Sequence, residues 1–485
     1  GSFGRMDWGS DDPFGRTPSF NVFPNLLTFR NGIDSKVMPW LGMALESWYA
    51  SRLEDNTSTW TRMRYGMTIE ERVNDKLTEM SLRDLVLDPE YRKMSHYALK
   101  SKGSFLFRMM ESAADRDDID ALLAELFDKY RHGNVPGEEF VSLLSKRHGI
   151  DLPAIAAGWY DDIALPGFLM SPVEIYSFLD GEREKFQVRF SVTNNEDTDG
   201  LIQFTFQQMD LNVRGGRGGR MRRMMDATMT MGEDYSKYVP VKAGETKELG
   251  FVLTFQPSKL DINTLVSRNL PVLLNIDLPE KLEEQKKAVP FDGERLLDKP
   301  VSLVEPGETV VDNEDPGFTF SSGTSKSLLK RLIPRGEREE DIKYVGMRFW
   351  GGGTNKWQPT IDSKFYGNQI RSAHFISGGN GDLKAAYTAE MEKSGHYDIY
   401  FYVSRIEAPW RRHRGGDHDE NYGKLHFLIY HDDGVEETEL DLNGADDGWN
   451  YLGSYYISRG EAKIELTNES DAEKVIADAV KWVLR

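Results

Sequence analysis

The sequence predicts a multidomain α plus β protein with an N-terminal α-helical unit, a central Ig-like β-sandwich and a C-terminal, jelly-roll-like β-sandwich. Its 485 residues exceed what one hydrophobic core usually organises. The spacing of apolar residues changes along the chain from a helical period to a period of two. A polar, turn-rich stretch then separates two β-rich regions. We therefore expect a helical domain at 1–165, the Ig-like sandwich at 166–280, a linker at 281–307 and the last sandwich at 308–485.

The helical prediction covers residues 39–157. Apolar residues recur there at three- and four-residue spacing, as in Leu41, Ala44, Leu45 and Trp48. Breakers at Gly133-Asn134 and Pro136-Gly137 separate the last two predicted helices.

The strand predictions begin near Pro172. Phe186, Val188, Phe190 and Val192 alternate with more polar residues, and turn signals separate this run from the next. The C-terminal region repeats the pattern, with predicted strands at 397–403, 425–430, 438–442, 449–457 and 462–466. Regular spacing of short strands is typical of β-sandwiches.

Composition narrows the classes of partner. A formal net charge of −19 repels nucleic acid phosphates and anionic lipid at long range, so we expect no nucleic acid partner. No apolar run approaches the roughly twenty residues that a membrane helix needs, so we expect no membrane span. The chain has no Cys, which excludes disulfides, thiolate metal sites and a cysteine nucleophile.

Several segments of the C-terminal region match a known pattern in order and spacing. They are Val311-Asp312-Asn313, Gly317-Phe318, Trp357, Tyr366-Gly367, Ala385-Ala386-Tyr387, the segment 395–400, the segment 449–453 and the ending 476–483. On these residues, the region from about Glu308 to Arg485 resembles the golvesin and xanthan-lyase type of carbohydrate-binding-like domain. The resemblance implies attachment to a glycan or another surface polymer, without chemistry of its own. For Trp449 and Tyr397 we expect core packing rather than ligand stacking, because large aromatic residues dominate sandwich cores.

A basic, aromatic segment at 408–416 supplies the first candidate binding residues, Trp410, Arg411, Arg412 and Arg414. These side chains could stack on a sugar and pair with uronate or sulfate groups. Asp417-His418-Asp419-Glu420 follows directly. Two other interpretations stay open, namely a solvated loop that neutralises itself and a cation site, for which structural Ca²⁺ is the candidate. No other cofactor is predicted.

A second arginine-rich segment lies at 214–223 and contributes the candidates Arg217 and Arg220. We interpret it as a mobile hairpin loop or a contact for an acidic partner or a lipopolysaccharide-like phosphate. RNA-binding RGG segments are long and repeated, whereas this one is short and lies in an acidic chain.

The stretch from Phe20 to Leu53 resembles the gluzincin, aminopeptidase N-like metallopeptidases in spacing. That family carries HExxH on a helix and, about twenty residues later, a WLNEG-type segment with the third zinc ligand. Trp40-Leu41-Gly42-Met43-Ala44 occupies the second segment here, which places Phe20-Asn21-Val22-Phe23-Pro24 where HExxH would stand. At Lys100-Ser101-Lys102-Gly103, Lys100 stands at the position of the family's catalytic tyrosine.

The residues at these positions cannot bind or use the zinc ion on which the family's catalysis depends. A catalytic zinc requires three protein ligands, a bound water and a glutamate general base. Phe, Asn, Pro and Met supply none of these, and Pro24 would break the HExxH helix. We therefore predict a degenerate, peptidase-like helical domain with no catalytic residues and no metal ligands, although whether the protein is an enzyme stays open.

Together these observations predict a non-catalytic, extracytoplasmic bacterial binding or scaffold protein, in the periplasm or at the cell surface. Its partner would be a glycan, a surface polymer or an envelope protein. The alternative is the C-terminal portion of a zinc metallopeptidase whose catalytic residues lie outside this chain.

Overall fold

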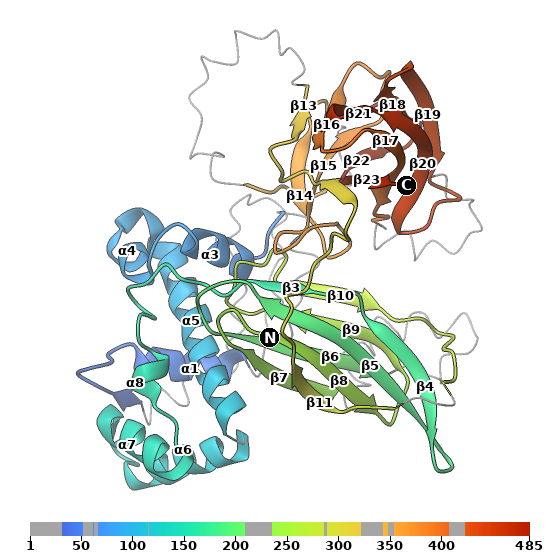
Figure 1. Cartoon of the computed structure of the whole chain (residues 1–485). Helices are drawn as coiled ribbons and strands as arrows, with labels where there is room; N and C mark the ends of the chain where they lie inside the picture. Colours follow the sequence, from blue (N-terminus) through green and yellow to red (C-terminus); the bar gives the residue numbers. More distant parts are fainter. Residues whose placement is uncertain are drawn as a thin grey trace, which may run out of the picture. The chain divides into compact units, whose positions relative to one another are not determined.

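A computed structural model of the chain describes residues 32–51, 62, 66–114, 116–208, 235–285, 289–321, 343–347, 354–406 and 422–485. The chain divides into two compact units (Figure 1). The first comprises residues 1–57 and 69–301, and the second comprises residues 58–68 and 302–485.

The first unit begins with helices around one long central helix, α5 (Arg92–Ala113), which packs against α1, α3 and α4. The other helices among the described residues are α1 (Leu41–Ser51), α3 (Ile69–Leu77), α4 (Leu82–Leu87), the 3-10 turn η1 (Pro89–Tyr91), α6 (Arg116–Lys129), α7 (Gly137–His148) and α8 (Leu152–Ile155). A short parallel pair, β1 (Ile33–Asp34) with β2 (Val135–Pro136), joins them. No helix of the described ranges is long and apolar enough to cross a bilayer.

Local sequence explains where α7 starts and stops. Glu138 and Glu139 lie in its first turn, where a negative charge interacts favourably with the positive end of the helix dipole. Its last turn carries Lys146, Arg147 and His148, and Gly149 follows in the left-handed conformation that ends many helices.

The crossing of α1 and α5 depends on one glycine. A Cβ atom placed on Gly103 would lie 2.6 Å from the Cα of Ala44, so only glycine lets the two helices approach this closely. Beside it, the buried Lys102 donates from Nζ to the carbonyl of Trp159, and the Trp159 indole donates back to the carbonyl of Lys102 at 3.0 Å. Burial lowers the pKa of Lys102 to about 8.

The same unit continues as a β-sandwich. One sheet has the order β10-β9-β6-β7 and the other β11-β8-β5-β3, with β4 also paired to β5. The strands are β3 (Phe168–Met170), β4 (Glu174–Asp180), β5 (Arg183–Asn194), β6 (Gly200–Gln208), β7 (Tyr235–Val241), β8 (Thr246–Leu253), β9 (Pro257–Asn263), β10 (Leu273–Asp277) and β11 (Gly293–Leu296). Four phenylalanine rings contact one another between the sheets, those of Phe190, Phe204, Phe206 and Phe251.

Buried hydrogen bonds join this sandwich to the helices. The Asn74 side chain donates to the carbonyl of Leu265 at 2.8 Å, and the backbone N–H of Val272 donates to Glu71 at 3.3 Å. Because an unpaired buried polar group is costly, these contacts favour one fixed arrangement of the two parts.

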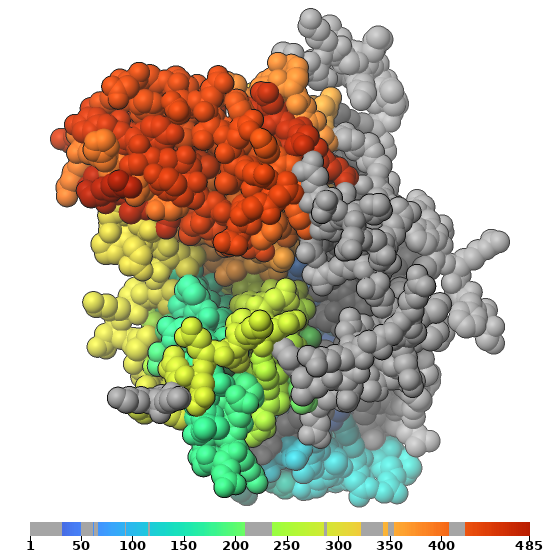
Figure 2. All heavy atoms as spheres, turned by 90° about the vertical axis from the view of Figure 1, so that its right-hand side faces the viewer, coloured from blue at the N-terminus to red at the C-terminus, as the bar shows by residue number. Residues whose placement is uncertain are grey.

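The second unit is a β-sandwich whose side chains form a closely packed body, coloured orange to red in Figure 2. Its sheets have the orders β12-β23-β17-β20, β13-β16-β21-β18-β19 and β14-β15-β22. The strands are β12 (Glu308–Val311), β13 (Phe318–Phe320), β14 (Gln358–Ile361), β15 (Ser372–Ser377), β16 (Lys384–Met391), β17 (Gly395–Val403), β18 (Lys424–His431), β19 (Gly434–Asp441), β20 (Gly448–Ile457), β21 (Gly460–Thr467), β22 (Lys474–Ala477) and β23 (Val480–Leu484). The predicted fold class, α plus β with an N-terminal helical region and β-sandwiches, is confirmed.

Replacing Gly103 with Val should destabilise the protein by about 1–3 kcal/mol, because the new side chain would force α1 and α5 apart. Urea unfolding of the full chain measures the change. Gly133→Val is the matched control, since a Cβ there meets nothing within 4 Å. Equal stability of the two variants would show that the close approach of the helices is not a constraint.

Candidate functional site

The candidate binding residues named from the sequence lie outside the described residues. The structure does not describe residues 407–421, which contain Trp410, Arg411, Arg412, Arg414 and the acidic stretch 417–420. It also does not describe residues 209–234, which contain Arg217 and Arg220. These assignments therefore stay predictions.

The two aromatic residues expected in the core have different positions. Tyr397 is 4% exposed and lies in the core, as predicted, and its hydroxyl donates to the carbonyl of Lys393 at 2.6 Å. The core prediction for Trp449 is wrong. Trp449 is only partly buried, and its ring contacts the ring of Tyr402 on the side of the sheet that faces away from the core.

Trp449 belongs to a cluster of rings on the outer side of the sheet β12-β23-β17-β20. We call this cluster the aromatic face, and its members are Tyr366, Tyr400, Tyr402, Trp449 and Tyr451. The centroid distances between neighbouring rings are 5.1–5.5 Å, and the rings meet at steep angles. Such edge-to-face packing is favourable and fixes the orientation of each ring. Tyr451 is 51% exposed, so the face reaches solvent.

A register shift between β17 and β20 makes this face possible. Ile399 pairs with Gly453, but the next residue, Tyr400, pairs with Tyr451, so Leu452 is an extra residue on β20. Side chains alternate between the two sides of a strand, and an extra residue reverses that alternation. Without the extra residue, Tyr451 and Trp449 would point toward the core. Bulges that redirect side chains in this way are over-represented near functional sites.

Paired charges flank the rings. Lys481 lies 4.9 Å from the ring centroid of Trp449 and 5.4 Å from that of Tyr400, and its ammonium group pairs with Glu308 at 2.7 Å. Cation–π contacts of this kind attract a lysine to the ring face. The Arg485 guanidinium pairs with Asp398 at 2.8 Å, which lowers the pKa of that carboxyl. Lys481 and Arg485 are therefore each paired with a carboxylate.

A buried carboxyl group lies beneath the rings. Asp478 is fully buried and accepts hydrogen bonds from the backbone N–H of Tyr366, at 3.2 Å, and from the Ser404 hydroxyl, at 3.1 Å. Burial raises the pKa of Asp478 well above its ordinary value. These hydrogen bonds attach the segment that carries the Tyr366 ring to the end of β17.

A second buried carboxyl group, Asp312, lies close enough to Asp478 for its charge to add to the rise in the pKa of Asp478. Burial is the main cause that raises the pKa of Asp312 to about 8, and the backbone N–H of Asn313 donates to its side chain at 2.7 Å.

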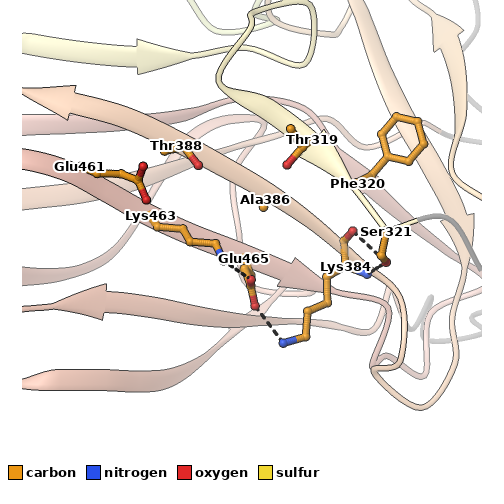
Figure 3. A pocket seen from close by; sticks show the side chains of 9 residues that line it. All are labelled: Thr319, Phe320, Ser321, Lys384, Ala386, Thr388, Glu461, Lys463 and Glu465. Carbon is orange, nitrogen blue, oxygen red and sulfur yellow. Dashed lines mark hydrogen bonds and ion pairs between the residues drawn. The ribbon is translucent and has the colours of Figure 1, made fainter.

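The opposite sheet has a hollow of about 480 Å³ on its outer side (Figure 3). Ala386 lies at its centre, and Glu465 is held there by Lys384 at 2.8 Å, Lys463 at 2.6 Å and the Tyr430 hydroxyl at 3.0 Å. The Phe320 ring at its border points away from the other labelled side chains. Among the residues that line this hollow only Phe320 is aromatic, whereas the aromatic face gathers five rings, so the aromatic face is the better candidate.

Within the described ranges, no group of three or more His, Cys, Asp or Glu side chains could hold a metal ion.

The two segments that carry the gluzincin resemblance meet in the first unit. The segment 40–44 runs into α1 and the segment 100–103 lies in α5, where Ala44 and Gly103 are in contact. The Lys-Gly pair has a structural role here, because Lys102 bonds Trp159 and Gly103 permits the crossing.

Comparison with known families supports the C-terminal assignment. The family model of the golvesin C-terminal domain matches residues 352–484, from β14 to β23. The golvesin-type resemblance predicted from the sequence is thus confirmed for this part of the chain. No curated protein matches the sequence.

Several solved structures are similar to parts of the chain. A xanthan lyase from Paenibacillus is 14% identical with a TM-score of 0.25, covering 67% of this chain and 25% of that chain. The chain therefore spans about a quarter of that enzyme's length. A CBM35 from Cellvibrio japonicus Abf62 is 15% identical with a TM-score of 0.18, covering 28% of this chain and 88% of that chain. A GH26-CBM35 β-(1,4)-mannanase from Podospora anserina is 14% identical with a TM-score of 0.17, covering 26% of this chain and 24% of that chain.

Asp312→Asn should flatten the pH dependence of stability. Because the folded-state pKa of Asp312 is raised to about 8, its contribution is fully present below about pH 4 and is lost as the pH rises toward 8. The amide oxygen of Asn can still accept from the N–H of Asn313. Thermal unfolding of the full chain between pH 5 and pH 9 tests this. Wild-type and variant curves of equal slope would contradict the raised pKa.

Proposed function

We propose that the C-terminal sandwich is a glycan-binding module and that the aromatic face is its binding surface. The observation that carries the proposal is the alignment of partly exposed rings on one outer sheet side, brought about by the extra residue in β20. Single exposed apolar side chains need no explanation, whereas a cluster of oriented rings on a sheet surface points to a ligand.

The chemistry of the face suits a sugar. One side of a pyranose ring carries C–H bonds and can bury apolar area against an aromatic ring. Its hydroxyl groups both donate and accept, which matches the Lys481–Glu308 and Arg485–Asp398 pairs, where donors and acceptors lie side by side. The golvesin-type match includes β17, β20 and β23, the three strands that carry most of these side chains.

Trp449→Ala and Tyr451→Ala should each weaken glycan binding by about tenfold, since truncating a central aromatic contact commonly costs more than about 1 kcal/mol. A glycan array probed with the full chain identifies ligands, and titration calorimetry gives the affinities.

Phe320→Ala is the control, because Phe320 is an exposed aromatic residue, 44% accessible, on the other sheet. The proposal fails if no glycan binds the wild-type chain, or if all three variants bind as it does.

We further propose that the helices are a peptidase-derived scaffold without a working zinc site, in a non-catalytic protein of the bacterial periplasm or cell surface. The contact between segments 40–44 and 100–103 supports it, because the resemblance implies that both segments border the active site of a gluzincin. Met43 and Lys100 stand at the positions of the acidic ligand and the tyrosine.

A zinc assay of the purified full chain tests this second proposal. We expect clearly less than one zinc per chain by elemental analysis, and no cleavage of aminopeptidase substrates after zinc is added. Stoichiometric zinc together with peptide cleavage would instead favour an active metallopeptidase.

A further inference from the structure

The aromatic face continues along β17 and β20 beyond its rings. Tyr402 pairs with Trp449 and Tyr400 with Tyr451, and beyond the register shift Asp398 pairs with Ser454 and His396 with Tyr456. The last pair also has a ring contact, with 5.4 Å between the centroids of His396 and Tyr456. Outward-facing side chains therefore form a continuous row of four cross-strand pairs.

The row is long compared with one sugar. From His396 to Tyr402 the strand advances six residues, which at about 3.3 Å per residue amounts to roughly 20 Å. Both ends carry partly exposed rings, Trp449 at one end and Tyr456, 41% exposed, at the other. Ring contacts are thus spread along the strands instead of being gathered around one point.

This geometry disfavours recognition of a single terminal sugar. Sites that hold one small molecule are concave and bury most of its surface. The outer side of a sheet touches a sugar from one side only, so each sugar residue contributes modest affinity. Useful affinity then requires several linked sugars, each over its own pair of side chains.

The charges along the row also limit the ligand. Lys481 is paired with Glu308, and Arg485 with Asp398, so these four groups have no net charge. An anionic sugar would have to compete with a carboxylate already held at 2.7–2.8 Å. An uncharged sugar can bond to both members of each pair without separating them.

Building on the proposed function, we infer that the aromatic face binds an internal stretch of a linear, uncharged polysaccharide, which lies along β17 and β20 over several consecutive sugar residues. The ligand class follows from the row of paired side chains and from the matched charges beside it.

A length series tests the inference. The full chain is titrated with cello-, manno- and galacturono-oligosaccharides of two to eight units. We expect affinity for a neutral series to rise at least about tenfold from the dimer to the longer oligomers and then to level off. Galacturono-oligosaccharides should bind more weakly than the neutral series.

Tyr456→Ala separates the two ends of the row. It should weaken binding of the longer oligomers several-fold and leave dimer binding nearly unchanged, whereas Tyr451→Ala should weaken both. Tyr235→Ala is the matched control, because Tyr235 is 40% exposed and lies in the other sandwich.

The possible results separate this inference from the proposed function. Absence of binding by every series would overturn both. Binding that Tyr451→Ala abolishes, but that is as strong for dimers as for octamers or strongest for galacturonates, would keep the glycan-binding function and overturn the extended, neutral ligand. Unchanged binding of long oligomers by Tyr456→Ala would also overturn the inference.

Discussion

The register between β17 and β20 is the constraint on which the candidate site depends. A strand presents alternate residues to opposite sides, so the position of one extra residue decides which half of β20 faces solvent. With Leu452 as that residue, Trp449 and Tyr451 join Tyr400 and Tyr402 outside, while Leu452 packs against the core. The same alternation keeps Tyr397 and Phe401 of β17 inside, so one strand serves both the core and the surface.

Buried polar groups hold the end of this face in place. Asp478 links the backbone of Tyr366 to Ser404, directly after β17, and so ties together two segments that are distant in sequence. The raised pKa values of Asp478 and Asp312 indicate that burial disfavours two adjacent negative charges there. A neutral carboxyl group can satisfy the hydrogen bonds without the cost of a buried charge. The hydrogen bonds of Asp478 thus hold in place the backbone next to the rings of Tyr366, Tyr402 and Trp449.

The spacing of apolar residues predicted much of the fold. A helix that buries one side has apolar residues about every 3.6 positions, and a sandwich strand has them at every second position. It did not reveal the outward position of Trp449, since the extra residue in β20 interrupts the alternation and only the pairing with β17 exposes it. A usable signal was present in the segment 397–403, where aromatic residues occupy both sides of one strand. In a strand with one solvated side, apolar residues normally alternate with polar ones. Aromatic residues on the outer side therefore indicate a ligand surface. The lysine of the Lys102-Gly103 pair likewise acquires its structural role only through Trp159, 57 residues away.

The charges beside the aromatic face act together with its shape. The whole chain carries −19, yet Lys481, Glu308, Arg485 and Asp398 beside the rings cancel. Long-range attraction therefore contributes little at this surface, and salt would screen what remains beyond about 10 Å. Selection of a partner must then occur at contact, through ring stacking and directional hydrogen bonds whose geometry the strands fix. Such a surface distinguishes polymers by the spacing and orientation of their hydroxyl groups, which is the property in which neutral polysaccharides differ most from one another.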